Sequence, residues 1–181
     1  MLAYGMKGEY YYDVEQPLFH ALDELYFNNP SRAFDIINDV KSCILFYKEN
    51  NDDVHDSDIK RAEWWMNTVN SMIKAEVPAN NIYDVFRLLE LKAALPRVKE
   101  KAVEQATSAA LEYVGILSQF SENMDEIHKR AIHNVDISSF IGLLASNVSD
   151  GIPKIIKPAV SKIENEVDKK LLELGYREQN S

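Results

Sequence analysis

Residues 80–120 read NNIYDVFRLLELKAALPRVKEKAVEQATSAALEYVGILSQF, and this stretch decides the fold. Asn81 can cap a helix whose apolar residues recur every three or four positions: Ile82, Val85, Phe86, Leu89 and Ala93. Pro96 lacks a backbone N–H and clashes with the preceding turn, so we expect the helix to stop or kink there. A second apolar stripe then follows on what we take as a separate helix: Val98, Ala102, Ala106, Ala109, Tyr113, Leu117 and Phe120. Its small residues predict close packing against another helix, from this chain or from a second one.

The rest of the chain shows the same helical spacing between short polar breaks. Asp13 can cap a first helix, and Asn28-Asn29-Pro30 ends it and starts the next. Further helical patterns carry Ala33 to Tyr47, Ile59 to Ile73, Ile127 to Ile132, Asp136 to Val148 and Ile156 to Leu174. The last of these has alternating charges and a regular apolar stripe, which is typical of a coiled coil.

We therefore predict an all-α fold: a compact bundle of about seven or eight helices with a coiled-coil-like C-terminal helix. Only 6 Gly and 6 Pro occur in 181 residues, which favours long elements that are rarely interrupted. No linker divides the chain, so residues 1–181 are expected to form a single helical domain. Residues 1–12 form an extended arm or a short strand in this prediction, and 176–181 form a frayed tail.

Composition excludes several classes of partner. The net charge is −9, and a surface that binds nucleic acid through its phosphates needs concentrated Lys and Arg. The single Cys43 cannot form an internal disulfide, and the first residues lack the pattern of a signal peptide. The longest uncharged apolar stretch, Ile137 to Val148, is too short to span a bilayer. We expect a soluble cytoplasmic protein, and its richness in Asn, Asp, Ile, Lys and Tyr is typical of AT-rich bacterial or phage genomes.

One set of residues suggests metal chemistry. His20, the pair His55-Asp56 and the distant Asp125 occur in an order and at separations that resemble helical metal-dependent phosphohydrolases of the HD type. The resemblance implies a divalent metal that activates water for attack on phosphorus. The pair departs from that family because it lies in a polar Asn- and Asp-rich stretch, with Ile59 and Lys60 where an acidic residue often follows. An HD-type phosphohydrolase using these four residues is therefore the alternative hypothesis.

The remaining candidates for chemistry are incomplete. Glu122, Asp125, Glu126, His128 and His133 resemble half of a di-iron site, but no second carboxylate–His pair accompanies them. Glu100 and Glu104 alternate with Lys99 and Lys101, so they fit an exposed helix side better than a magnesium site. Phosphate-binding glycine loops, a nucleophile elbow and a zinc motif are all absent. We assign no catalytic, cofactor-binding or metal residue, and the chain is expected to need no cofactor.

Three residues are candidates for binding a protein partner: Trp64, Val160 and Val167. Neighbouring residues on a helix point about 100° apart, so Trp64 and Trp65 cannot both lie deep in one core. Trp65 continues the apolar stripe, and Trp64 then lies at its boundary, where either a partner or another helix of the chain covers it. Together these patterns favour a non-enzymatic helical interaction module, an adaptor, assembly factor or regulator, that self-associates. The sequence leaves any small-molecule ligand unknown.

Overall fold

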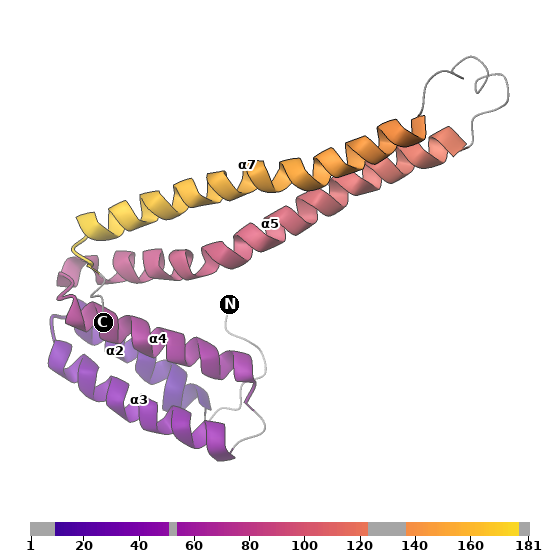
Figure 1. Ribbon diagram of the computed structural model, residues 1–181. Coiled ribbons are helices and arrows are strands. Elements are labelled where there is room, and N and C mark those ends of the chain that lie inside the picture. The colour runs from indigo at the N-terminus through magenta and orange to yellow at the C-terminus, as the bar shows by residue number, and fades with distance from the viewer. Residues whose placement is uncertain (1–9, 51–53, 123–136, 178–181) are drawn as a thin grey trace. The chain divides into compact units, whose positions relative to one another are not determined.

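The computed structural model describes residues 10–50, 54–122 and 137–177, and every regular element in these ranges is helical (Figure 1). The prediction of an all-α fold is therefore confirmed. The chain divides into two compact units, Met1–Leu91 with Val167–Ser181, and Lys92–Glu166. We call them unit 1 and unit 2 and describe each by itself. The single-domain organisation stays a prediction.

The described residues form five α-helices and two short helical turns. In chain order these are the π-helical turn η1 (Tyr11–Glu15), α2 (Gln16–Tyr26), α3 (Pro30–Asn50), α4 (Asp56–Lys74), the 3₁₀ turn η2 (Ala79–Asn81), α5 (Ile82–Glu122) and α7 (Ile137–Glu173). The predicted number of seven or eight helices and the coiled-coil detail are not confirmed. The expected helix around Ile127 to Ile132 lies outside the described residues.

The prolines explain most of the difference in helix number. Pro96 lies inside α5, and Pro153 and Pro158 lie inside α7, so none of them ends its helix. A proline inside a helix costs about 3 kcal/mol because one backbone hydrogen bond is lost. The long flanking runs of helix-forming residues and the packing of each helix outweigh that cost here. The expectation that Pro96 separates two helices is therefore wrong.

The core of unit 1 follows the predicted apolar stripes. On α3, the buried side chains are Ala33, Ile37, Val40, Ile44 and Tyr47, which are the five residues expected from the sequence. They pack with buried side chains of the other elements of this unit: Leu18, Ala21, Leu22 and Leu25 from α2, Ile59, Ala62, Val69 and Met72 from α4, and Ile82, Val85 and Phe86 from the start of α5. Figure 1 shows α2, α3 and α4 side by side. The break between α2 and α3 is as predicted, because Asn28 takes a φ of 60° and Pro30 begins α3.

Both described ends of the chain are anchored in this core, so two predictions about the ends are wrong in part. Tyr10 is fully buried, its ring packs edge-on against Tyr47 at 5.1 Å, and its hydroxyl donates to the backbone oxygen of Asp58 at 3.2 Å. Residues 10–12 are therefore helical and not an arm, and 1–9 lie outside the description. Tyr176 is also buried, and its hydroxyl donates to Oγ of Ser71 at 3.2 Å. Burial of these two rings removes apolar area from water, and this holds the segments around Tyr10 and Tyr176 against the core of unit 1.

Unit 2 is a helical hairpin formed by residues 92–122 of α5 and 137–166 of α7, which run antiparallel side by side (Figure 1). Among the side chains that the structure describes there, the buried large ones are Leu95, Val114 and Val160. Ala102 and Ala106 are half-buried as the stripe predicts, but Tyr113 is 72% exposed and Val98 is 51% exposed. The predicted face is therefore wrong by one position near Tyr113. Residues 105–121 are apolar or small on nearly every side, so the helical period there cannot single out one face.

We predict that Gly175→Ala lowers the free energy of unfolding by about 1–3 kcal/mol. Gly175 has a φ of 89°, and a Cβ atom there would lie 2.9 Å from Cδ of Pro78. The matched control is Gly151→Ala in α7, where an added Cβ meets nothing within 4 Å and should add about 0.5–1 kcal/mol. Urea titrations followed by circular dichroism measure both. Equal stabilities for the two variants would contradict the prediction.

Candidate functional site

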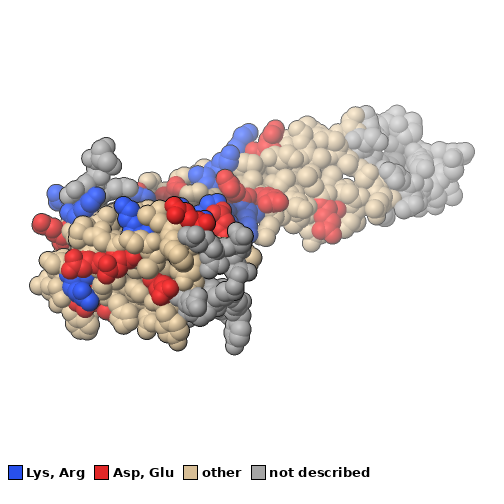
Figure 2. All heavy atoms as spheres, turned by 90° about the horizontal axis from the view of Figure 1, so that it is seen from below, with Lys and Arg blue, Asp and Glu red and all other residues tan. Residues whose placement is uncertain are grey.

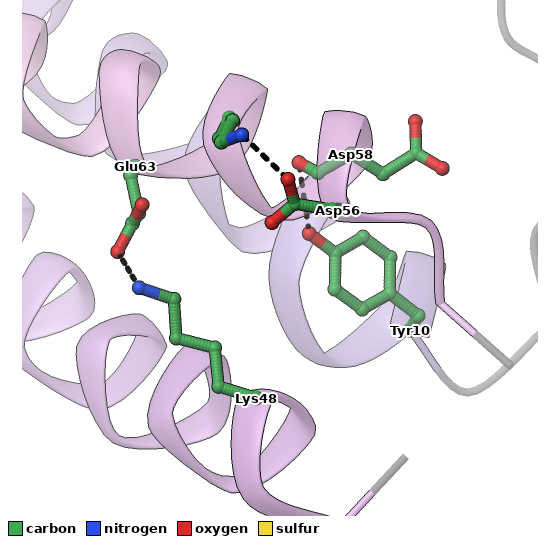
Figure 3. A network of polar contacts seen from close by, with 6 residues as sticks. Tyr10, Lys48, Asp56, Asp58 and Glu63 are labelled. Carbon is green, nitrogen blue, oxygen red and sulfur yellow. Dashed lines mark hydrogen bonds and ion pairs between the residues drawn. The ribbon is translucent and has the colours of Figure 1, made fainter. Parts of the chain in front are cut away.

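The three described residues of the HD-type hypothesis, His20, His55 and Asp56, do not form a metal site. His20 is exposed on α2, and His55 is exposed immediately before α4. Asp56 is in the first turn of α4, where its carboxylate pairs with Nζ of Lys60 at 2.5 Å (Figure 3). Among the described residues, no group of three or more His, Cys, Asp or Glu side chains could hold a metal ion. Asp125 lies outside the described residues.

Most residues of the di-iron-like set lie outside the described residues. Asp125, Glu126, His128 and His133 all fall within 123–136, which lies outside the description, and Glu122 is the last residue of α5. Figure 3 shows the contacts of two acidic residues of α4. Glu63 pairs with Lys48 of α3, and the backbone oxygen of Asp58 accepts a hydrogen bond from the hydroxyl of Tyr10. These contacts hold helices of unit 1 together.

The three candidate partner-binding residues lie in different surroundings. Trp64 is half-buried at the edge of the unit 1 core, with its ring 5.9 Å from that of Phe86. Val167 is 5% exposed within the same core, and Val160 is 8% exposed in the seam of the hairpin. The two valines therefore pack against side chains of their own unit, and their binding role stays a prediction.

Unit 1 contains an open cavity of about 400 Å³, which we call the aromatic pocket. Three segments line it, each with residues spaced like one helix face: Glu15, Phe19 and Leu22 from η1 and α2, Arg61 and Trp65 from α4, and Tyr83, Phe86, Arg87 and Glu90 from α5. Its volume is near the lower end of the roughly 300–1,000 Å³ that is usual for ligand pockets. The pocket is therefore large enough to hold a small molecule.

Aromatic rings form the walls of this pocket. The ring of Trp65 lies 4.4 Å from that of Phe19 in an edge-to-face arrangement, and 5.1 Å from that of Phe86. Tyr83 and Phe19 are each 40% exposed, whereas Phe86 is 7% exposed. Rings at these distances attract one another by about 0.5–1.5 kcal/mol per pair beyond the area they bury. The floor is therefore packed, while the upper walls remain open to solvent.

The polar groups of the pocket differ in whether they already have a partner. Glu15 is buried and forms an ion pair with Arg61, which also lies 3.7 Å from the carboxylate of Asp58. Arg87 and Glu90 are both exposed at the rim, and neither forms an ion pair with any residue that the structure describes. One cation and one anion therefore remain available at the mouth of the pocket.

Tyr83 carries a perturbed hydroxyl at the same rim. It donates to a carboxylate oxygen of Asp23 at 2.5 Å. This hydrogen bond, with smaller contributions from burial and from the negative charge of Asp23, raises the pKa of Tyr83 to about 12. Cys43 is only half-buried, and partial desolvation raises the pKa of its thiol, which keeps it protonated and unreactive.

Unit 2 offers a second surface, which we call the distal hairpin: residues 105–121 of α5 and 137–153 of α7. Its only charged residues are Glu112 and Asp150. Several large apolar side chains are nevertheless exposed there: Leu111, Tyr113, Ile116 and Leu143, with Ile155 just beyond. Figure 2 shows this sparsity of charge as the largely tan face of the hairpin. Such contiguous uncharged surface is uncommon on a monomer.

Comparison with known proteins identifies no relative: no family model, curated protein or solved structure matches this chain. Within the described residues, no helix is long and apolar enough to cross a membrane. The aromatic pocket and the distal hairpin are therefore the two candidate sites of this protein.

We predict that Arg61→Ala lowers the stability of the chain by about 3 kcal/mol, because it leaves the buried carboxylate of Glu15 without its cation. The control is Lys60→Ala, which breaks a solvent-exposed pair with Asp56 and should change the stability far less. Urea unfolding of the two variants gives the difference. A loss as small for Arg61→Ala as for Lys60→Ala would show that the Glu15 pair contributes little.

We also predict that one tyrosine titrates near pH 12 and that it is absent from Tyr83→Phe. The ultraviolet absorbance of phenolate measures this, and Asp23→Asn should return the transition toward pH 10. Because the pKa in the folded chain lies above that in the unfolded chain, the stabilisation is complete below about pH 10 and is lost as the pH rises toward 12. An unchanged titration curve in Asp23→Asn would refute the assignment.

Proposed function

We propose that this protein is a non-enzymatic helical interaction module that self-associates through the distal hairpin. The observation that carries the proposal is the combination of exposed large apolar side chains and missing charge in residues 105–121 and 137–153. An enzymatic role has less support, since the described members of the HD-type set do not converge.

The first support is the packing of unit 2. Two helices can bury only the stripe that each turns toward the other. On α5 that stripe is rich in alanine, and on α7 it carries Ile141, Leu144, Val148 and Ile156, which are only half-buried. The seam therefore leaves part of its own apolar area exposed to water. Association would bury the exposed side chains of Tyr113, Ile116 and Leu143 as well, at about 1.5–3 kcal/mol for each large apolar side chain before the costs of association. The hairpin thus gains stability from a partner.

The second support concerns the identity of that partner. The chain carries a net charge of −9, so most approaches of two copies bring like charges together. The distal hairpin has only Glu112 and Asp150, and two copies can therefore meet there with little repulsion. Two hairpins placed side by side give four helices around a shared apolar core, which is a common architecture for helical proteins. A twofold-symmetric pair of this kind needs only one self-complementary surface.

We predict that the wild-type chain forms a dimer or larger oligomer at micromolar concentration and that Ile116→Glu with Leu143→Glu converts it to a monomer. Each substitution places a charge on a surface that would be buried on association. Sedimentation velocity between about 1 and 100 µM measures the mass.

The matched control is Phe27→Glu, which places the same charge at a 74% exposed aromatic residue of unit 1 and should leave the assembly unchanged. A wild-type chain that is monomeric at 100 µM would overturn the proposal. So would a double variant that retains its helical circular dichroism and assembles as the wild type does.

A further inference from the structure

The aromatic pocket of unit 1 has the dimensions and lining of a site for a small molecule. Its volume of about 400 Å³ fits one compact ligand better than an extended peptide. The lining residues come from three segments packed on one core, and Phe86 and Leu22 of the floor are buried. Since the floor is fixed by this packing, the pocket exists without a ligand and needs little rearrangement to receive one.

The walls select the body of the ligand. Phe19, Trp65, Tyr83 and Phe86 line the pocket, and the ring of Trp65 meets Phe19 edge-to-face and Phe86 in a tilted arrangement. A planar aromatic group that packs on this cluster would extend these contacts. An aliphatic chain would bury area but would lose these ring contacts, so an aromatic body is favoured.

The rim selects the charges of the ligand. Arg61 is already used by Glu15 and Asp58, which leaves Arg87 and Glu90 as the charged pocket residues without an ion pair in the described structure. They are one turn apart on α5, where side chains of opposite charge at this spacing gain only a few tenths of a kcal/mol from each other. A ligand that offers a carboxylate to Arg87 and an ammonium group to Glu90 therefore competes only with the weak attraction between these two side chains. The Arg side chain can also bind a carboxylate through two parallel hydrogen bonds.

We infer that the aromatic pocket binds a small zwitterion with an aromatic body, of the chemical class of the free aromatic α-amino acids. The ring enters the pocket lined by Phe19, Trp65, Tyr83 and Phe86, and the two charged groups meet Arg87 and Glu90 at the rim. This inference is independent of the self-association of the distal hairpin, which lies in unit 2.

Three probes with the same aromatic body test the inference by isothermal titration calorimetry on the full chain. These are L-phenylalanine, 3-phenylpropionate, which lacks the ammonium group, and phenethylamine, which lacks the carboxylate. L-phenylalanine should bind with a Kd below about 1 mM, and each of the other two at least threefold more weakly. Equal binding of all three would show an apolar pocket without charge recognition and would overturn the inference, as would no binding of L-phenylalanine below 10 mM.

Two rim variants then assign the charges. Arg87→Gln should weaken the binding of L-phenylalanine and 3-phenylpropionate at least threefold and leave that of phenethylamine unchanged. Glu90→Gln should weaken the binding of L-phenylalanine and phenethylamine at least threefold and leave that of 3-phenylpropionate unchanged. Both residues are exposed, so the variants should fold, which circular dichroism verifies. Asp39→Asn, an exposed change on α3 away from the pocket, and the double variant Ile116→Glu with Leu143→Glu should bind as the wild type does. Binding that both rim variants leave unchanged would place the ligand elsewhere and overturn the inference.

Discussion

The burial of the returning C-terminal segment in unit 1 is the interaction on which the rest of this structure depends. Val167, Leu171 and Tyr176 lie in the same core as Ile82 and Val85, although more than 80 residues separate them in the sequence. The side-chain amide of Asn81 also donates to the backbone oxygen of Leu174 at 3.0 Å. The chain therefore leaves unit 1 in α5 and returns to it in α7, and unit 2 is an insertion held at both of its ends.

This arrangement bears on the stability of the hairpin. A free pair of helices would have to supply all of its own stability, whereas only Leu95, Val114 and Val160 are buried among the large side chains that the structure describes in unit 2. Here the helices of the hairpin are continuations of helices that unit 1 already fixes, so their nucleation is not an additional cost. The apolar surface of the distal hairpin is then free to serve association.

Some elements of the fold could be predicted from local chemistry. The stripe of α3 from Ala33 to Tyr47 was predicted in full, because its spacing of three and four residues defines one face even though apolar residues such as Phe34 and Phe46 lie off it. The break after α2, where Asn28 takes a positive φ, was also predictable from residue type. The prediction was wrong at Pro96, Pro153 and Pro158, which lie inside their helices. The cost of a proline in a helix can be estimated from the sequence, but the packing energy that outweighs it cannot. Around Tyr113 the helical period of apolar residues did not identify the buried face, because α5 itself is apolar or small on nearly every side there.

The sites were less predictable than the fold. The spacing of Tyr83, Arg87 and Glu90 indicates that they share a helix side, but the aromatic pocket exists only because two other segments bring Phe19 and Trp65 to that side. Sequence separation cannot show such convergence, and for the same reason it suggested a metal set from His20, His55 and Asp56 that the fold does not assemble. Trp64 and Trp65 are both half-buried and both lie near Phe86, and Trp65 lines a cavity that no motif indicated.

The alanine seam of the hairpin also has a consequence for the alignment of its two helices. Ala102, Ala106 and Ala110 are half-buried at intervals of four residues, so sliding one helix by a turn of about 5.4 Å brings an alanine to the place of the next. The small residues therefore define how near the helices come but not which residues lie opposite one another. That alignment depends on larger side chains, which cannot exchange places with alanine: the buried Leu95, Val114 and Val160, and the half-buried Ile141, Leu144, Val148 and Ile156 of α7. The large side chains thus set the alignment that the alanines leave open.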